Sequence, residues 1–326
     1  MTSAFRLTSD PMGGAPESSL IETFCLPLLQ NAQNADGGWG FHPGSQSRVE
    51  ATCWALHALI CSAWPETQEV IANGFRFLRA AQLSDGSWPS APHESVGCWV
   101  TSLACWVLLR DKESSRAVAS GLKWLCEDWP RDSTPWQRLL RRVSSRHRIF
   151  PQNDSYRGWG WTPRTSSWVE PTSFALLVLG QSPEELLPAA AKRRQQLAVA
   201  LLYDRMCPGG GWNCGNPLVY GVAGDPLVIP TTWALLALRD HPNRPEKAMS
   251  LEWLEGNISS IHGPGSLALA RICLESYGRS WPTTTPDLRD LHRKNEFLQS
   301  VQVTAWACLA LTATRQWLTP ASTEIS

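Results

Sequence analysis

The sequence lacks the local signatures of several common enzyme classes. Its glycine-rich run at 209–211 is not followed by Gly-Lys-Ser or Gly-Lys-Thr, and neither His-Glu-x-x-His nor Gly-x-Ser-x-Gly occurs. These absences argue against a P-loop nucleotide site, a zincin and an α/β-hydrolase. An excess of one charge is also missing, because 29 Lys and Arg residues balance 29 Asp and Glu residues. We therefore expect no nucleic-acid partner.

Long apolar runs are absent as well. No stretch reaches the length of a membrane-spanning helix, and the polar residues 1–19 lack the apolar core of a signal peptide. We expect a cytoplasmic protein and leave a peripheral membrane contact open. The 10 cysteines include no Cys-x-x-Cys and lie mostly in apolar helical patterns, which indicates free thiols packed in a core. Cys207 and Cys214 are the one pair that bonding or a metal would suit.

Tryptophan is abundant, with 18 copies against 4 Tyr and 8 Phe. Four indoles occur in glycine-rich turns, and an apolar helical segment follows each turn. The turns are Asp36–Trp39, Asp85–Trp88, Gly158–Trp161 and Gly209–Trp212, with Trp39, Trp88, Trp159 and Trp212 as the recurring indoles. The following segments contain Thr52, Thr101, Thr172 and Thr231, and a fifth similar segment contains Thr304. A unit repeated at this scale predicts an array of helical hairpins.

The spacing of the repeats predicts a closed ring. A degenerate copy at 265–270 fits between the fourth and fifth segments, which makes six apolar helices. More polar helical segments alternate with them, and no period-2 strand pattern occurs. We therefore predict an all-α fold, an (α/α)6 barrel over residues 18–318. A flexible segment at 1–17 and a tail at 319–326 would flank this single domain.

One insertion, at about 129–153, is strongly basic. It includes Arg141, Arg142 and Arg146. A solvated basic helix explains such a run. A diphosphate site is the other interpretation, because guanidinium groups suit phosphate oxygens.

The segment Gly74–Trp88 resembles the QW motif of squalene and oxidosqualene cyclases, in which a Gln precedes Gly-x-Trp. Here Gln82 is followed by Gly86-Ser87-Trp88. Most of the chain is similar to the terpenoid-cyclase and protein-prenyltransferase toroid group, which has the (α/α)6 fold. The resemblance implies that Gln82 and the four turn tryptophans brace the repeats and do not act in catalysis.

The sequence departs from this group in two ways. Class II cyclases protonate an alkene or epoxide with an Asp-x-Asp-Asp motif before the Thr-Ala of one inner helix. That motif is absent here, and Gln302 precedes Val303-Thr304-Ala305. Those cyclases also pair two barrels, whereas this chain has the length of one. Prenyltransferase relatives bind zinc with Asp, Cys and His, and the spacing of Glu50 and Cys53 does not match theirs.

Two glutamates are the leading candidates for an acid. Glu50 and Glu170 lie two residues before Thr52 and Thr172. In an apolar cavity such a carboxyl would have a raised pKa and could protonate an alkene. Both also match the capping box Ser-x-x-Glu, with Ser47 and Ser167, and that role would favour the ionised form.

Further residues complete the candidate site. Asp225 is a third candidate acid in the long loop 213–228, where an Asp-Pro turn is the alternative interpretation. Aromatic faces that could bind a substrate and stabilise carbocations belong to Trp54, Trp99, Trp106, Phe174, Trp233, Trp306 and Tyr220. His57 is expected to be a core residue.

Three functions stay open from the sequence. The first is a cyclase-like isomerase or lyase that binds an isoprenoid and cyclises it by acid-initiated carbocation chemistry, with no cofactor and no metal. The second is a non-catalytic toroid that binds an isoprenoid or a protein. The third is a prenyltransferase-like zinc enzyme. A second subunit or a homodimer is compatible with each of them.

Overall fold

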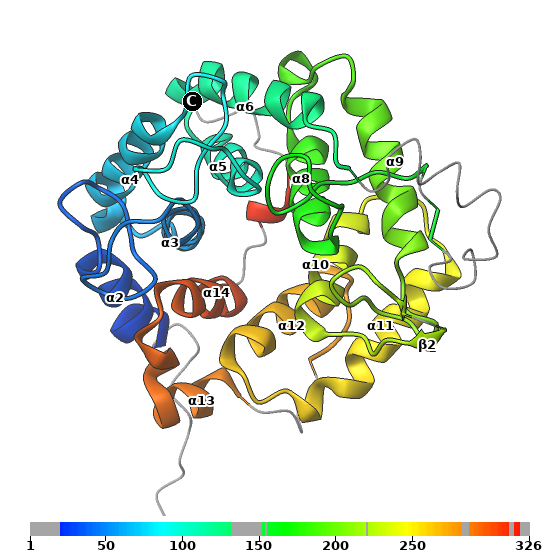
Figure 1. Ribbon diagram of the computed structural model, residues 1–326. Helices are drawn as coiled ribbons and strands as arrows, with labels where there is room; N and C mark the ends of the chain where they lie inside the picture. The colour runs from blue at the N-terminus through cyan, green and yellow to red at the C-terminus, as the bar shows by residue number, and fades with distance from the viewer. Residues whose placement is uncertain are drawn as a thin grey trace, which may run out of the picture.

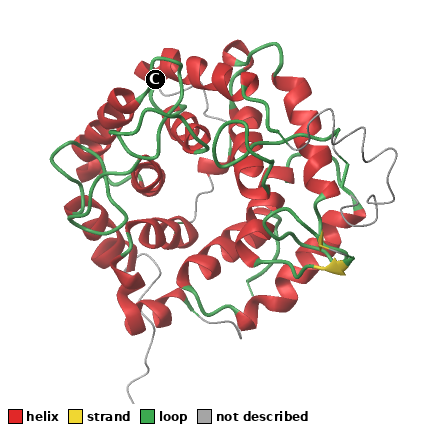
Figure 2. Ribbon diagram, viewed as in Figure 1, coloured by secondary structure: helices red, strands yellow, loops and turns green. Residues whose placement is uncertain are grey.

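A computed structural model describes residues 20–131, 152–153, 155–219, 221–281, 287–312 and 316–319. Helices dominate these residues (Figure 2). In the described part of the chain the only strands are β1 (Leu218–Val219) and β2 (Val222–Ala223), which form an antiparallel hairpin. The all-α prediction is confirmed.

Apolar helices form a closed inner ring (Figure 1). Each packs against the next in chain order, and the last packs back on the first. Their side chains are buried almost all round, as a helix covered on both sides requires. They are α3 (Val49–Ser62), α5 (Val100–Leu108), α8 (Val169–Gln181), α10 (Val228–Leu238), α12 (Pro264–Ser276) and α14 (Val301–Leu311).

A second set of helices surrounds the ring, and each packs on one or two of the inner helices. On α4, for example, Phe75, Phe77 and Leu78 are buried while Arg76 faces solvent. The architecture is therefore the predicted (α/α)6 barrel. The outer helices are α2 (Leu26–Asn31, preceded by the π-helical turn Ile21–Cys25), α4 (Gln68–Ala81), α6 (Ser115–Glu127), α9 (Ala191–Asp204), α11 (Pro245–Asn257) and α13 (Leu288–Asn295).

The tryptophan turns connect the two rings by a repeated pair of hydrogen bonds. The backbone N–H of Trp88 donates to Thr101 Oγ1 of α5 at 2.9 Å, and its Nε1 donates to the Leu78 carbonyl at the end of α4 at 2.7 Å. Trp39, Trp159 and Trp212 make the same two bonds, to Thr52, Thr172 and Thr231 and to carbonyls of Leu29, Leu125 and Leu202. Each turn thus fixes an outer helix to the start of the inner helix that follows.

Two further features lock these turns. Gln82 Nε2 donates to the Gly86 carbonyl and to the Ala117 carbonyl of α6, both at 2.9 Å. Gly86 has φ +92°, and a Cβ there would lie 2.7 Å from the Ser120 carbonyl oxygen. Only glycine allows both this backbone conformation and this close approach.

Thr304 lacks the bond that the other threonines make. It is fully buried like Thr101, but its Oγ1 has no hydrogen-bond partner among the described residues. We predict that Thr101→Val lowers the free energy of unfolding by about 1–3 kcal/mol, because the buried Trp88 N–H loses its acceptor. Thr304→Val should be neutral or stabilising. Urea unfolding of the two variants measures the difference, and equal losses would contradict this account of the turns.

Candidate functional site

The threonine bonds set which side chains of the inner helices face the ring axis. The residue two before each threonine and the residue two after it are four apart, so they share one helix face. The first layer, at the N-terminal ends of the inner helices, contains Glu50, Trp99, Glu170, Ile229 and Gln302. The second layer contains Trp54, Leu103, Phe174, Trp233 and Trp306.

Glu50 is a half-buried carboxyl whose pKa is raised to about 7. Burial is the main cause, and the charge of Glu170 raises the pKa further. Gln302 Nε2 of α14 donates to Glu50 Oε1 at 2.8 Å and moderates the shift. The indole N–H of Trp54 also lowers the pKa, although it forms no hydrogen bond of ordinary geometry among the described residues. The carboxyl is thus partly protonated at neutral pH.

Glu170 is the second acid of this layer. Burial raises its pKa to about 7 as well. The charge of Glu170 in turn contributes to the raised pKa of Glu50. The structure therefore places two carboxyls with raised pKa values at the same end of the ring.

The capping-box interpretation of these glutamates is wrong. The N-caps of α3 and α8 are Arg48 and Trp168, and neither makes a side-chain capping bond. Ser47 Oγ instead donates to Asp36 Oδ1 at 2.8 Å, and Ser167 Oγ accepts from the Gly158 N–H at 3.0 Å. The pKa values also move upward, whereas a capping carboxylate would have a lowered pKa.

The aromatic side chains of the second layer meet across the ring. Trp54 of α3 stacks on Trp233 of α10 with ring centroids 5.3 Å apart, although these two helices are opposite each other in the ring order. Phe174 and Trp306 also contact Trp54, at 6.2 Å and 5.6 Å. The described side chains therefore fill the ring at this level and form an aromatic floor beneath the acids.

The opposite end of the ring is filled by the C-terminal segment. Trp317 of η8 (Gln316–Leu318) is fully buried and lies 5.3 Å from Trp106, and η8 is inside the ring in Figure 1. Arg110 and Arg239, which follow α5 and α10, donate to the carbonyls of Thr319 and Leu318 at 2.6 Å and 2.7 Å. These bonds place η8 at the C-terminal ends of the inner helices, away from the acids.

His57 lies in this filled region, as the sequence indicated. It is 1% exposed, and its ring centroid is 4.9 Å from that of Trp106. Burial lowers its pKa to about 3, so the imidazole is neutral. Trp106 itself donates its indole N–H to Gln181 Oε1 at 2.8 Å, and it is distant along the helix from the acid layer.

Of the remaining candidate residues that the structure describes, only Trp99 lies in the same layer as the two acids. Trp99 is half-buried and stacks on Phe174 at 5.3 Å, between the two acids in the ring order. Asp225 is exposed in the loop after β2 and does not contribute to the pKa of either glutamate. Tyr220 and the arginines Arg141, Arg142 and Arg146 lie outside the described residues. All 10 cysteines are free, including Cys207 and Cys214.

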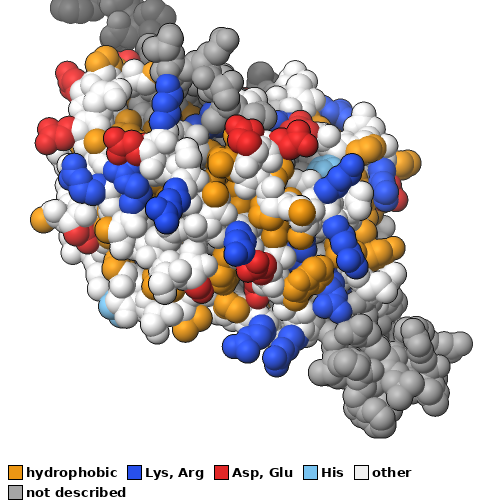
Figure 3. Space-filling view, turned by 90° about the horizontal axis from the view of Figure 1, so that it is seen from above, with side chains coloured by type: hydrophobic (Ala, Val, Ile, Leu, Met, Phe, Trp, Pro, Cys, Tyr) orange, Lys and Arg blue, Asp and Glu red, His pale blue; other side chains and the backbone are white. Residues whose placement is uncertain are grey.

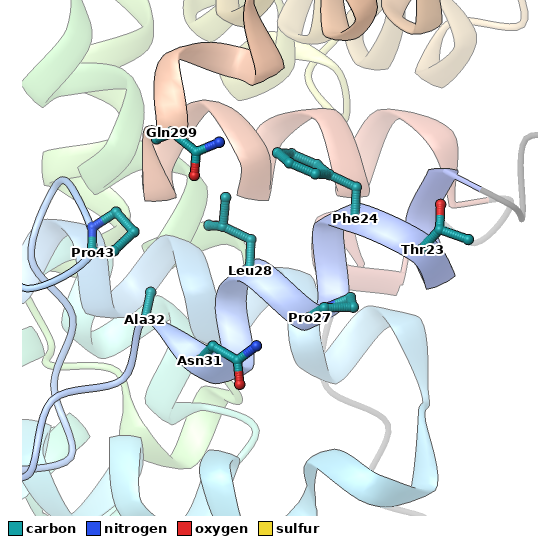
Figure 4. Close-up of a pocket in the computed structure, with 8 residues that line it drawn as sticks. All are labelled: Thr23, Phe24, Pro27, Leu28, Asn31, Ala32, Pro43 and Gln299. Atoms are coloured by element: carbon teal, nitrogen blue, oxygen red, sulfur yellow. The ribbon is translucent and has the colours of Figure 1, made fainter.

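A surface pocket of about 290 Å³ lies on the outer ring (Figure 4). Phe24, Leu28, Pro43 and Gln299 are among its walls. None of the candidate acids or ring-facing aromatic residues lines it, so it is separate from the acid layer.

Charged side chains of both signs occur on the one face of the molecule that Figure 3 draws. On the face drawn in Figure 3, basic and acidic side chains are interspersed with apolar ones. None of the helices in the described part of the chain combines the length and apolar character that crossing a bilayer requires.

Comparison with known proteins links this toroid to terpene cyclases. No protein-family model matches the sequence. Drimenyl diphosphate synthase from Streptomyces showdoensis is 25% identical over 244 residues, which are 63% of this chain and 44% of that protein. Human lanosterol synthase is 35% identical over 72 residues, 19% of this chain and 10% of that protein. The chain thus spans less than half the length of these relatives.

Solved structures share the fold across nearly the whole chain. The type II terpene cyclase MstE from Scytonema has a TM-score of 0.53 at 13% identity, covering 94% of this chain and 82% of that one. An α-1,6-mannanase from Salegentibacter has a TM-score of 0.59 at 9% identity, covering 92% and 99%. The protein is therefore an (α/α)6 toroid. Taken with the sequence relatives, it is a terpenoid-cyclase-like toroid.

The raised pKa of Glu50 predicts a specific pH dependence of stability. A carboxyl whose pKa rises from 4.5 to about 7 on folding stabilises the protein fully at low pH, and this contribution is lost as pH rises through 7. Glu50→Gln should therefore gain stability relative to the parent protein between pH 5 and pH 8, by up to about 3 kcal/mol. The histidines titrate in both proteins, so their contributions cancel when the stability of the parent protein is subtracted from that of the variant. Denaturant unfolding at both pH values tests this, and a pH-independent difference would contradict it.

Proposed function

We propose that this protein binds an isoprenoid at the N-terminal end of the ring and cyclises it by protonating an alkene, with Glu50 as the proton donor. The observation that carries the proposal is the Glu50 carboxyl itself, which is partly protonated at neutral pH and lies directly above an aromatic floor. The sequence similarity to drimenyl diphosphate synthase supports the same class of chemistry. Because the fold is shared with a mannanase, the fold alone would not support it.

The first chemical step follows from the geometry of Glu50. Its Oε1 accepts the Gln302 hydrogen bond, which leaves Oε2 to carry the proton. The alkene π pair takes that proton and forms a new C–H bond, so that a carbocation remains on the substrate and a carboxylate on Glu50. Further π pairs then close rings by attacking the cation.

The aromatic floor would support that cation. Trp306 and Phe174 belong to this floor, and Trp99 of the layer above stacks on Phe174 at 5.3 Å. Indole faces attract cations most strongly among the aromatic side chains. A reaction in which a carbocation persists through several bond-forming steps requires such stabilisation.

Activity of the Glu50→Gln variant tests the proposal. The purified chain is incubated with squalene, farnesyl diphosphate or geranylgeranyl diphosphate, and products are identified by gas chromatography and mass spectrometry after dephosphorylation. We expect cyclic products from one of these substrates and their loss in Glu50→Gln, because an amide cannot protonate an alkene. Glu69→Gln, on the exposed face of α4, is the matched control and should retain activity. A toroid that binds these isoprenoids without making product would be a binding protein instead.

Gln302 gives a second prediction, on the pH profile. Its hydrogen bond lowers the pKa of Glu50. In Gln302→Leu the pKa should rise further, so the acid stays protonated to higher pH and the alkaline fall in kcat moves upward. The measurement is kcat against pH from 5 to 9 for the parent protein and the variant. An unchanged profile would mean that the amide does not act on the acid during turnover.

A further inference from the structure

An acid-initiated cyclisation also needs a group that ends it. The final carbocation must lose a proton or capture water, and a carboxylate is a suitable acceptor. Resting on the proposed function, we infer that Glu170 is the base that ends the cyclisation, accepting the proton that the final carbocation releases.

The position of Glu170 is the first support. It occupies the same place relative to Thr172 that Glu50 occupies relative to Thr52, so both carboxyls belong to one layer of the ring. The ring order α3, α5, α8 leaves only Trp99 of α5 between them. A bicyclic or larger product above the floor would therefore meet the two carboxyls at different points on its edge.

The contacts of the two glutamates differ in a way that separates their roles. Glu50 is held by Gln302 at 2.8 Å, which orients its proton. Glu170 accepts no hydrogen bond and forms no ion pair within the described ranges, and burial alone accounts for its raised pKa. Without such a donor, both oxygens of the Glu170 carboxylate are available to accept a proton from the substrate. It also stabilises a nearby cation by direct attraction.

The surroundings of Glu170 suit a proton acceptor that must be reset. Phe174, one turn below it, stacks on Trp99 at 5.3 Å and gives an apolar wall. Glu170 itself is half-buried, so its carboxyl is within reach of solvent. The proton taken by Glu170 can return to Glu50 through water at the open end of the ring.

The balance of the whole cycle closes without another reactant. Glu50 gives one proton to the alkene. Glu170 removes one proton from the carbon beside the final cationic centre, and that C–H pair becomes the new π bond. Return of the proton from Glu170 to Glu50 restores the starting state, and the net reaction is an isomerisation.

The pKa values of Glu50 and Glu170 also depend on the titratable groups around them. Glu50 faces Glu170 and the thiols of Cys53 and Cys98, and Glu170 faces Glu50 and the thiol of Cys214. Burial raises the pKa of all three thiols, so they stay neutral. The charge of Glu170 is therefore the one that acts on Glu50.

The test is the product pattern of Glu170→Gln. The variant keeps the acid, so we expect substrate consumption within about tenfold of the parent rate. Alkene products should give way to alcohols, because water captures the cation that no base deprotonates. The alkaline limb of kcat should also move to lower pH, since Glu50 loses its charged neighbour. Glu170→Asp keeps a carboxylate and should retain alkene as the main product.

Two outcomes would overturn the inference. The first is an unchanged alkene product and pH profile in Glu170→Gln. The second is an unchanged pKa of Glu50 in Glu170→Gln. This outcome decides the matter if the parent protein cyclises none of the isoprenoids, a result that would by itself refute the proposed function. The pair is then tested by ¹³C NMR titration of the Glu50 carboxyl, and an identical midpoint in the parent and in Glu170→Gln would show that the two acids are not coupled. Circular dichroism checks that each variant is folded.

Discussion

The hydrogen bond between a turn tryptophan and the first-turn threonine of an inner helix is the constraint on which the rest of the toroid depends. It is made four times with distances of 2.8–3.0 Å. Each bond fixes both the rotation and the height of an inner helix, so residues at equal offsets from the threonines form layers around the axis. The acids and the aromatic floor are two such layers. The indole N–H of each turn tryptophan also bonds the preceding outer helix. The same four turns therefore position both the outer and the inner helices.

The local, repeated features explain how much of the fold could be predicted from the sequence. The threonine spacing and the apolar helices defined six hairpins, and the structure has them at nearly the expected residues. Periodicity gives the direction of a side chain but not the width of the ring. It therefore identified Trp54 and Trp233 as inward-facing and could not show that they touch. Trp317 follows the last inner helix and belongs to no periodic pattern. The sequence therefore did not predict that its indole fills the barrel at the C-terminal ends of the inner helices.

The candidate site shows a similar division. The shared offset of Glu50 and Glu170 from their threonines predicted two equivalent carboxyls, and the same offset in α14 could have identified Gln302 as their neighbour. The capping-box motif misled because Ser47 belongs to the turn, where Asp36 and Asn34 bind it. Local motifs compete with tertiary contacts that a single sequence does not reveal. At the position two residues before the threonine, α14 carries the amide of Gln302 and the adjacent α3 carries the carboxyl of Glu50.

The buried indole of Trp317 has a consequence for how the chain becomes a folded protein. The first inner helix, α3, contacts both the last inner helix and Trp317. During synthesis, α3 therefore stays without these partners until the segment around Trp317 has been made. Contacts between such distant residues slow folding and prolong the exposure of aggregation-prone surface. Closure of the ring therefore joins residues that are far apart in the sequence, and α3 completes its buried surface only when α14 and Trp317 have folded against it.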